Sequence, residues 1–350
     1  MFCTILRNKN FRERERVKSK NLFEEIISLE NLFLAWKEFK KGKTKKYDVC
    51  QFTQHLRENI VKLNQDLENK SYQHSRYQSF YIKDPKLRHI HKACVRDRVL
   101  HHAIFRMLYP IFDKHFIFDS YSCRNQKGTH KAVKRLNNFA RKVSANNSKK
   151  CFFLKCDIKK FFDSIDQDIL ISLIEKKVKD GNTLWLIKKV IKSFHKGLPL
   201  GNITSQLFAN VYLNELDQFI KHNLKAKYYI RYCDDFIIAE DCPENFSNYL
   251  ESISNFLRDK LKLSLHSDKI IVRRYNQGID FLGYVSFPHH IVLRPKTGKR
   301  VLRKVSIRTR ELKENKLLEK CFNQILHSYF GMLKHCQGYN IKRKILNLLK

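Results

Sequence analysis

The sequence predicts an α+β protein, and three stretches of the chain indicate it. Residues 227–239 contain two short aromatic and β-branched runs around a pair of adjacent aspartates, as two hairpin strands do. Residues 151–157 form an apolar run that ends in an acid, which is typical of a buried strand. Residues 204–220 carry apolar side chains at helical spacing. The chain therefore combines strands with helices.

Composition indicates a folded protein that handles a polyanion. The 350 residues are 43% hydrophobic, enough for one large domain or two to three small ones. Seventy Lys and Arg against 34 Asp and Glu give a formal charge of +36. Nucleic acid is the first expected partner and an anionic membrane surface the second. The basic residues alternate with Tyr, Phe and His along the whole length, which favours an extended nucleic-acid groove over one amphipathic helix.

Cysteine usage and the start of the chain indicate the compartment. The ten cysteines form no Cys-x-x-Cys pair, so neither a zinc ribbon nor a redox motif is indicated, and reduced thiols are expected. Residues 1–7 lack a secretory apolar region, and no apolar run approaches the roughly 18–20 residues of a membrane span. We expect a soluble cytoplasmic protein, bacterial, archaeal or phage-encoded, that makes no membrane contact.

The N-terminal 80 residues are predicted to be mainly helical. The predicted apolar face consists of Leu22, Ile26, Leu29, Phe33 and Trp36. The charged run Arg12–Arg16 is interpreted as a solvated helix face. Residues 40–46 form a basic loop that contacts either phosphate or water.

The acids Asp234 and Asp235 form the centre of the predicted site. Neighbouring side chains of a straight strand point to opposite faces, so these two act together only where the strand bends into a hairpin turn. Hard divalent cations prefer carboxylate oxygens, and phosphoryl transfer uses two such ions roughly 3.5–4 Å apart. The alternative is an Asp-Asp turn without chemistry.

Asp157 supplies a third acid at the end of its strand. Its alternative role is that of a helix N-cap. A strand-terminal Asp upstream of an aromatic-flanked Asp-Asp hairpin is the arrangement that a two-metal polymerase palm requires. Tyr232-Cys233-Asp234-Asp235 resembles the Tyr-x-Asp-Asp motif of reverse transcriptases, and residues 156–162 resemble their first acidic motif.

The resemblance implies a right-hand polymerase fold with an antiparallel palm sheet and an RNA-directed DNA polymerase activity. It implies that Asp157, Asp234 and Asp235 are catalytic, and that the same acids and Ile158 bind two Mg²⁺ ions, with Mn²⁺ as the alternative. The implied domains are an N-terminal helical extension (1–80), fingers (81–150), palm (151–290) and a helical thumb (291–350). We expect no ribonuclease H, endonuclease or integrase domain.

Several basic residues have roles implied by the same family. Arg88, Arg124 and Lys127 match positions in the fingers that contact the triphosphate and template; for each, the alternative is an exposed surface charge. Lys269 matches a lysine that can protonate the leaving pyrophosphate, with an exposed lysine at a strand start as the alternative. Residues 281–284 match the primer grip. Residues 294–350 hold 16 Lys or Arg against three Glu, which suits a thumb on a duplex backbone.

Phe162 follows Asp157 by five places, where the family has a ring that excludes a sugar 2′-hydroxyl. The alternative is an ordinary core side chain. Asp166 and Asp168 are predicted to cap the following helix rather than to bind metal. Leu200, Gly201 and Gln206 belong to the loop expected to contact the template and the incoming nucleotide. That loop feeds a helix predicted to start near Thr204, and a plain helix entry is its alternative.

The same loop indicates which subfamily of reverse transcriptases the chain resembles. Most group II intron and retron enzymes have Pro-Gln-Gly followed by Ser-Pro, whereas this chain has Pro199-Leu200-Gly201 and Ser205-Gln206, and here it resembles the reverse transcriptases of diversity-generating retroelements. That resemblance implies adenine-directed mutagenesis and a small basic accessory protein, in addition to template RNA, a DNA or RNA primer and dNTPs. The alternatives are a group II intron, retron or defence-associated enzyme, and a catalytically idle RNA-binding derivative. The three intact acids argue against the last.

Overall fold

The structure, a computed structural model, describes residues 21–84 and 86–349. It divides into two units. Unit 1 comprises Met1–Phe116, Lys160–Glu215 and Leu261–Leu263; unit 2 comprises Ile117–Lys159, Leu216–Lys260 and Ser264–Lys350. The predicted run Arg12–Arg16 lies outside the described residues. Division into four consecutive domains stays a prediction.

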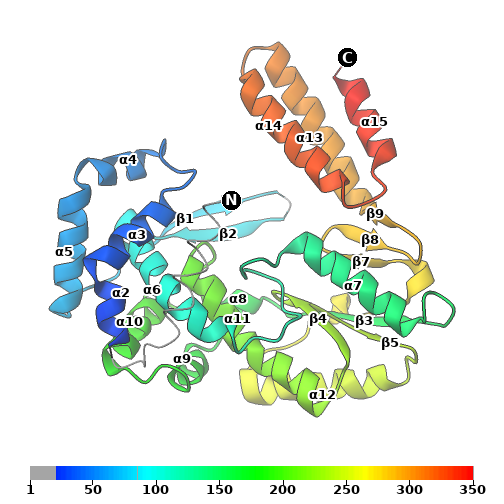
Figure 1. Cartoon of the computed structure of the whole chain (residues 1–350), viewed down its shortest axis with the longest axis horizontal. Helices are drawn as coiled ribbons and strands as arrows, with labels where there is room; N and C mark the ends of the chain where they lie inside the picture. The colour runs from blue at the N-terminus through cyan, green and yellow to red at the C-terminus, as the bar shows by residue number, and fades with distance from the viewer. Residues whose placement is uncertain (1–20, 85, 350) are drawn as a thin grey trace, which may run out of the picture. The chain divides into compact units, whose positions relative to one another are not determined.

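Unit 1 is mainly helical, with one hairpin (Figure 1). The hairpin pairs β1 (Gln78–Ile82) with β2 (Arg88–Lys92) in antiparallel register. The helices are α2 (Leu22–Ile27), α3 (Leu29–Phe39), α4 (Tyr47–Gln54), α5 (Leu56–Glu68), α6 (Val95–Asp113), α8 (Phe161–Ser164), α9 (Gln167–Glu175) and α10 (Gly181–Lys192). Helix α11 (Ile203–Gln218) begins within one residue of the predicted start and continues into unit 2.

The predicted apolar helical face near the N-terminus is confirmed for Leu22, Ile26 and Trp36, which are buried, and is wrong for Leu29 and Phe33. The backbone of Ser28 is extended, with a ψ of 140°, and its hydroxyl accepts a hydrogen bond from the N–H of Asn31 at 3.2 Å, so one helix ends there and a new one begins. The new helix turns Leu32 and Trp36 inward. Leu29 and Phe33 are consequently 41% and 37% exposed.

The capping predictions have different outcomes. Asp166 does cap α9: its carboxylate accepts hydrogen bonds from the N–H groups of Asp168 and Ile169, each at 3.0 Å. Asp168 caps nothing, because it already lies inside the first turn; its side chain instead accepts a hydrogen bond from Lys192 at 2.6 Å on the surface.

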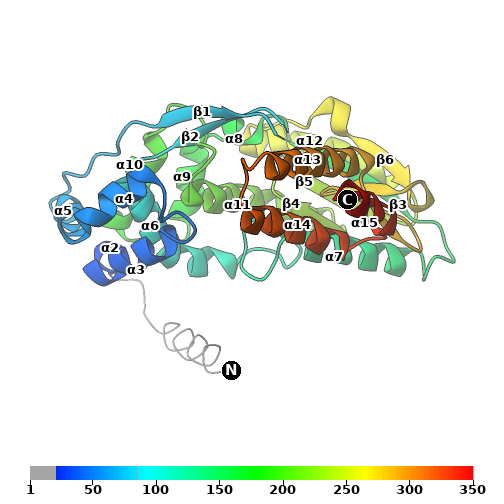
Figure 2. The same cartoon turned by 90° about the horizontal axis from the view of Figure 1, so that it is seen from above.

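Unit 2 is built on a four-stranded antiparallel sheet in the order β4-β5-β3-β6. Its strands are β4 (Tyr228–Tyr232), β5 (Asp235–Glu240), β3 (Phe152–Asp157) and β6 (Ile271–Arg274). Helices α7 (Thr129–Val143) and α12 (Asn245–Leu261) lie on opposite faces of this sheet in both views (Figures 1 and 2). Consecutive apolar residues on the strands point alternately to the two faces and make both suitable for covering, and Phe153 and Ile237 share a core with Leu136 and Phe139 of α7.

Two further parts complete unit 2. A second antiparallel sheet contains β7 (Ile279–Phe281), β8 (Tyr284–Ser286) and β9 (Ile291–Leu293). Three helices follow it and lie side by side: α13 (Pro295–Lys313), α14 (Glu319–Leu333) and α15 (Tyr339–Leu348) (Figures 1 and 2). Their apolar stripes meet at Val305, Phe322 and Ile345, which are buried.

The helices and antiparallel sheets confirm the predicted α+β class. Within the described residues, every helix is too short or too polar to cross a bilayer.

Candidate active site

Three aspartates gather at one end of the four-stranded sheet. Asp157 is the last residue of β3 and Asp235 is the first of β5, and the two lie directly opposite each other in the antiparallel register. Directly paired residues share a face of the sheet, with Cβ atoms about 4.5–5.5 Å apart. Asp234 lies in the turn before Asp235, after Cys233, whose φ of 57° is left-handed. That bend lets two consecutive acids serve one site.

The electrostatics of the site are those of crowded carboxylates. Burial raises the pKa of Asp234, and the charge of Asp157 raises that pKa further. Burial also raises the pKa of Asp235. The Lys155 ammonium lies 3.8 Å from the Asp235 carboxylate and opposes that increase. Three acids that repel one another in a half-buried site need positive charge nearby.

Lys269 supplies part of that charge. Its Nζ lies 2.6 Å from Oδ1 of Asp157, and the lysine is half-buried in a one-turn 3-10 helix, Ser267–Lys269, rather than exposed at the start of a strand. The residue predicted to donate a proton is thus placed beside the first acid. Its role in the reaction stays a prediction.

Main-chain hydrogen bonds fix the end of β3. The N–H of Ile158 donates to the carbonyl of Asp234 at 3.3 Å, and the N–H of His266 donates to the carbonyl of Asp157 at 2.8 Å. Because the Ile158 side chain is buried and apolar, only its main chain could bind a metal. These bonds tie the strand end to the hairpin turn and to the residues before Lys269.

The residue that the sequence reasoning missed is Arg231. Its guanidinium and the carboxylate of Asp217 have no exposed side-chain surface, and they form a two-pronged ion pair with distances of 2.7 Å from Nε and 2.6 Å from Nη2. The Tyr229 hydroxyl also donates to Asp217 at 2.7 Å. Burial alone would lower the pKa of Arg231, but the Asp217 charge raises it beyond its usual value. The sequence feature that could have indicated this ion pair is a basic residue inside the apolar strand 228–232.

This ion pair also reaches the catalytic turn. Nη1 of Arg231 donates to the carbonyl of Cys233 at 3.0 Å, and Nη2 donates to the hydroxyl of Ser120 at 3.1 Å. The main chain of Arg231 is held as well. On the outer side of the edge strand β4, its N–H donates to the carbonyl of Asp119 at 3.0 Å. Arg231 therefore connects the turn that carries Asp234 to a buried anchor.

The predicted phosphate ligands Arg124 and Lys127 lie in the neighbouring loop of unit 2. Arg124 donates to the carbonyls of Ile117 and Ser120, at 2.6 and 3.1 Å. Lys127 donates to the carbonyl of Phe118 at 2.7 Å, and its Nζ lies 3.4 Å from the centre of that residue's ring. Both cations shape the loop here, and their contact with a triphosphate stays a prediction.

The remaining candidates belong to unit 1, so their roles toward the three acids stay predictions. Arg88 is exposed on β2, and Gln206 is exposed in the first turn of α11. Phe161 is 2% exposed and packs in the core, whereas Phe162 is only half-buried. The half-buried ring is the one that the resemblance assigns to sugar discrimination.

The loop with Leu200 is held between α8 and β2. The carbonyl of Leu200 accepts a hydrogen bond from the N–H of His91 at 3.0 Å, and the N–H of Leu198 donates to the carbonyl of Phe162 at 2.8 Å. Gly201 has a φ of 128°, and a Cβ there would lie 3.2 Å from the His91 carbonyl oxygen. Glycine is thus needed for the backbone's close approach to the hairpin.

The donor set of the three aspartates fits a hard divalent cation. All side-chain donors are carboxylate oxygens, the ligands that Mg²⁺ prefers. In residues 21–84 and 86–349, no three acidic, His or Cys side chains converge at ligand distance, and the Lys269 ammonium lies 2.6 Å from the Asp157 carboxylate. Mutual repulsion at Asp234 and Asp235 is what a bound dication would relieve.

Comparison with known families identifies the fold. Residues 82–286 match the family described as "Reverse transcriptase (RNA-dependent DNA polymerase)". The chain belongs to the reverse transcriptase family. Membership confirms the predicted enzyme class and the predicted right-hand polymerase fold, while the acids described above lie within the matched residues.

Curated relatives of this reverse transcriptase include intron-encoded proteins. The chain is 28% identical over 302 residues to the group II intron-encoded protein LtrA of Lactococcus lactis subsp. cremoris, which covers 65% of this chain and 49% of that protein. It is 24% identical to the protein YkfC of Escherichia coli (strain K12), covering 57% of this chain and 63% of the relative. The match thus spans about half the length of LtrA.

Among solved structures, the telomerase from Candida albicans in complex with a fragment of telomeric RNA has 12% sequence identity and a TM-score of 0.49, covering 81% of this chain and 61% of that one. The predicted diversity-generating lineage is not shown by these relatives.

Proposed function

We propose that this reverse transcriptase copies an RNA template into DNA, with Asp157, Asp234 and Asp235 as ligands of two Mg²⁺ ions and the main chain of Ile158 as a further ligand. The observation that carries the proposal is the register Asp157↔Asp235 across β3 and β5, with Asp234 in the adjoining turn. Three carboxylates at one sheet end serve no packing purpose, since burial disfavours their charged forms.

The bound ions would supply Lewis-acid activation of the primer 3′-hydroxyl and would stabilise the negative charge that develops on the phosphate oxygens. The chain's own residues do the rest. Asp157, Asp234 and Asp235 would hold the ions, and Lys269 would donate the proton that the leaving pyrophosphate takes up. Lys155 balances the negative charge of the site from the same strand as Asp157.

The substrates follow from the charge of the protein. Template RNA, a DNA or RNA primer and dNTPs are all polyanions, and they complement the net charge of +36. Arg88, Arg124 and Lys127 are proposed to contact the triphosphate and template, and Phe162 to exclude the 2′-hydroxyl. Mn²⁺, with similar oxygen ligands, can replace Mg²⁺.

Primer extension on a defined RNA template with Mg²⁺ tests this function. The wild-type protein should extend the primer, and Asp234→Ala should not, while both bind the RNA with similar affinity because the substitution removes no positive charge. Wild-type protein that binds primer and template but adds no nucleotide would support the alternative, an idle RNA-binding derivative.

Leu200 and Gln206 favour a finer assignment, a diversity-generating retroelement with adenine-directed mutagenesis and a small basic accessory protein. Leu200 presents an apolar side chain where most relatives have a Gln able to hydrogen-bond the nascent pair, so mispairs would be rejected less strongly. Sequencing of cDNA should show errors mainly opposite template adenines, reduced by Leu200→Gln with Gln206→Pro. Equal error rates at all four bases would favour a group II intron or retron type, as would flanking DNA without a template repeat and a variable repeat.

A further inference from the structure

A hollow in unit 1 lies outside every residue discussed for the polymerase site. It has a volume of about 660 Å³ and is lined by Gln73, His74, Gly181, Leu184, Trp185, Lys188, Lys189, Lys192 and Ser193. That volume is within the range of ligand-binding pockets. All of these residues belong to unit 1, so the hollow can be considered apart from the catalytic acids.

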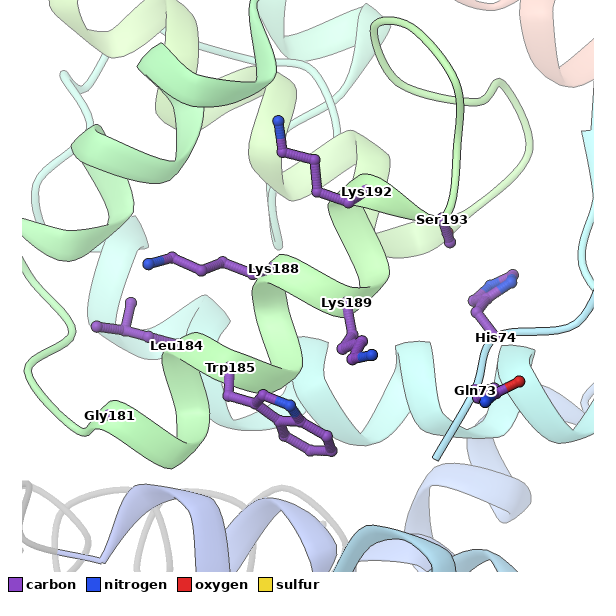
Figure 3. Close-up of a pocket in the computed structure, with 9 residues that line it drawn as sticks. All are labelled: Gln73, His74, Gly181, Leu184, Trp185, Lys188, Lys189, Lys192 and Ser193. Atoms are coloured by element: carbon purple, nitrogen blue, oxygen red, sulfur yellow. The ribbon is translucent and has the colours of Figure 1, made fainter. Parts of the chain in front are cut away.

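One side of the hollow combines an aromatic ring with a cation. Trp185 and Lys189 are one helical turn apart on α10, and both point toward Gln73 and His74 (Figure 3). Trp185 is half-buried and makes a T-shaped contact with the ring of Phe23 at a centroid distance of 6.3 Å. Part of its surface lines the hollow.

The lining carries positive charge and no carboxylate. Lys188 pairs with Glu175 at 2.7 Å and Lys192 with Asp168 at 2.6 Å, but all four side chains are at least 40% exposed. Exposed pairs of this kind are weak, so a phosphate can replace the acids. Among the described residues Lys189 has no ion-pair partner.

Both walls are held rigidly from behind. On one wall, buried Asp97 accepts hydrogen bonds from the Tyr72 hydroxyl and the Ser75 N–H, each at 2.9 Å, which fixes the chain on both sides of Gln73 and His74. On the other, Asp180 caps α10 and accepts a hydrogen bond from the N–H of Phe23 at 2.8 Å. The hollow is thus preformed, which lowers the entropic cost of binding.

We propose that this hollow binds an unpaired nucleotide of RNA, with the base stacked on Trp185, its edge against the Gln73 amide and a phosphate on Lys189. Gln73 is exposed and offers both a donor and an acceptor to a base edge. Aromatic stacking with adjacent cations is how proteins hold single strands without strict sequence preference. A base within a duplex has both faces covered, so only unpaired RNA can bind in this way.

Tryptophan fluorescence of the protein can report this contact. It has only two tryptophans, and Trp36 is 2% exposed. In full-length Trp36→Phe protein, fluorescence therefore comes from Trp185. A 12-nucleotide single-stranded RNA of mixed sequence should quench it on binding, and the same sequence annealed into a duplex should bind through other surfaces without quenching.

Variants then test affinity. Gln73→Ala and Lys189→Gln leave the packing of α10 intact, and Lys189→Gln should reduce by about 0.7 the slope of log affinity against log salt for single-stranded RNA. Trp185→Ala should weaken that binding by about tenfold or more. Lys62→Ala, an exposed helical lysine of the same unit, is the matched control and should change neither quantity.

Thermal unfolding is measured on the same samples, so that a lost contact can be told apart from a variant that does not fold. Equal quenching by duplex and single strand, or a salt slope for Lys189→Gln equal to that of Lys62→Ala, would overturn the proposal. Quenching of Trp185 by an acidic peptide but not by single-stranded RNA would overturn it as well, and would assign the hollow to a protein partner.

Discussion

The ammonium of Lys269 lies 2.6 Å from the Asp157 carboxylate, although 112 residues separate the two in the chain. The contact exists because β3 is followed by an isolated bridge between Ile158 and Leu265, which brings the segment before Lys269 to the end of the strand. A cation that also carries protons is therefore positioned at the first acid of the site.

Lys269→Gln tests whether that lysine takes part in the reaction. Loss of a positioned proton donor should lower kcat by about 10²- to 10⁴-fold with a smaller change in the KM for dNTP. Single-turnover primer extension measures this, with Lys260→Gln, an exposed helical lysine of unit 2, as the control. A kcat equal to that of the control would show that Lys269 takes no part in the reaction, as proton donor or as charge.

Arg231→Met should destabilise the protein strongly. It leaves the buried carboxylate of Asp217 without a partner, and breaking such pairs costs about 3–5 kcal/mol. The double variant Arg231→Met/Asp217→Leu should recover much of this loss, because no buried charge remains unpaired. Denaturant titration measures the free energy of unfolding.

The exposed pair Arg258–Asp259 gives the matched control for Arg231. Its side chains are 68% and 56% exposed, so Arg258→Ala should cost no more than about 1 kcal/mol. If the double variant is stable yet inactive, Arg231 is needed to hold the turn at Cys233. A stable and fully active double variant would contradict that positioning role.

Gly201→Ala should destabilise unit 1 by at least about 1 kcal/mol, because its φ of 128° is unsuited to alanine and the new Cβ would press on the His91 carbonyl at 3.2 Å. Gly181 of the same unit has open space around it and no positive φ. Gly181→Ala should therefore be neutral or slightly stabilising. Similar unfolding free energies for the two variants would show that the loop adapts.

Phe162→Ala should admit ribonucleotides with little loss of dNTP incorporation, since the removed ring is proposed to block the 2′-hydroxyl. Phe161→Ala is the comparison: Phe161 is 2% exposed, and its loss should cost about 3–5 kcal/mol of stability without changing sugar selection. Competition between ribo- and deoxynucleoside triphosphates on one template measures selectivity. Unchanged selectivity in Phe162→Ala would make that residue an ordinary packing side chain.

Local patterns in the sequence were sufficient to predict the parts of the structure that depend on residues close together in the chain. The hairpin around Asp234, the strand ending in Asp157 and the cap at Asp166 all follow from strand period, turn geometry or capping preference. The structure contains each of them.

What could not be predicted depends on contacts between distant segments. The exposure of Leu29 follows from the helix break at Ser28, which helical periodicity does not reveal. The buried pair of Arg231 with Asp217 joins a strand to the end of a helix, and Lys269 reaches Asp157 only through the bridge at Ile158. A basic residue in an apolar strand shows that a partner must exist, but not which residue it is.

The most direct test of the account counts metal ions at the three acids. Electron paramagnetic resonance measures Mn²⁺ bound to a complex of the protein, an RNA template, a 3′-deoxy-terminated primer and the next dNTP. Two ions should bind the wild-type protein and Asp163→Ala, whose carboxylate is exposed, and at least one should be lost or greatly weakened in Asp157→Ala. Unchanged Mn²⁺ number and affinity in Asp157→Ala would contradict the assignment of this site.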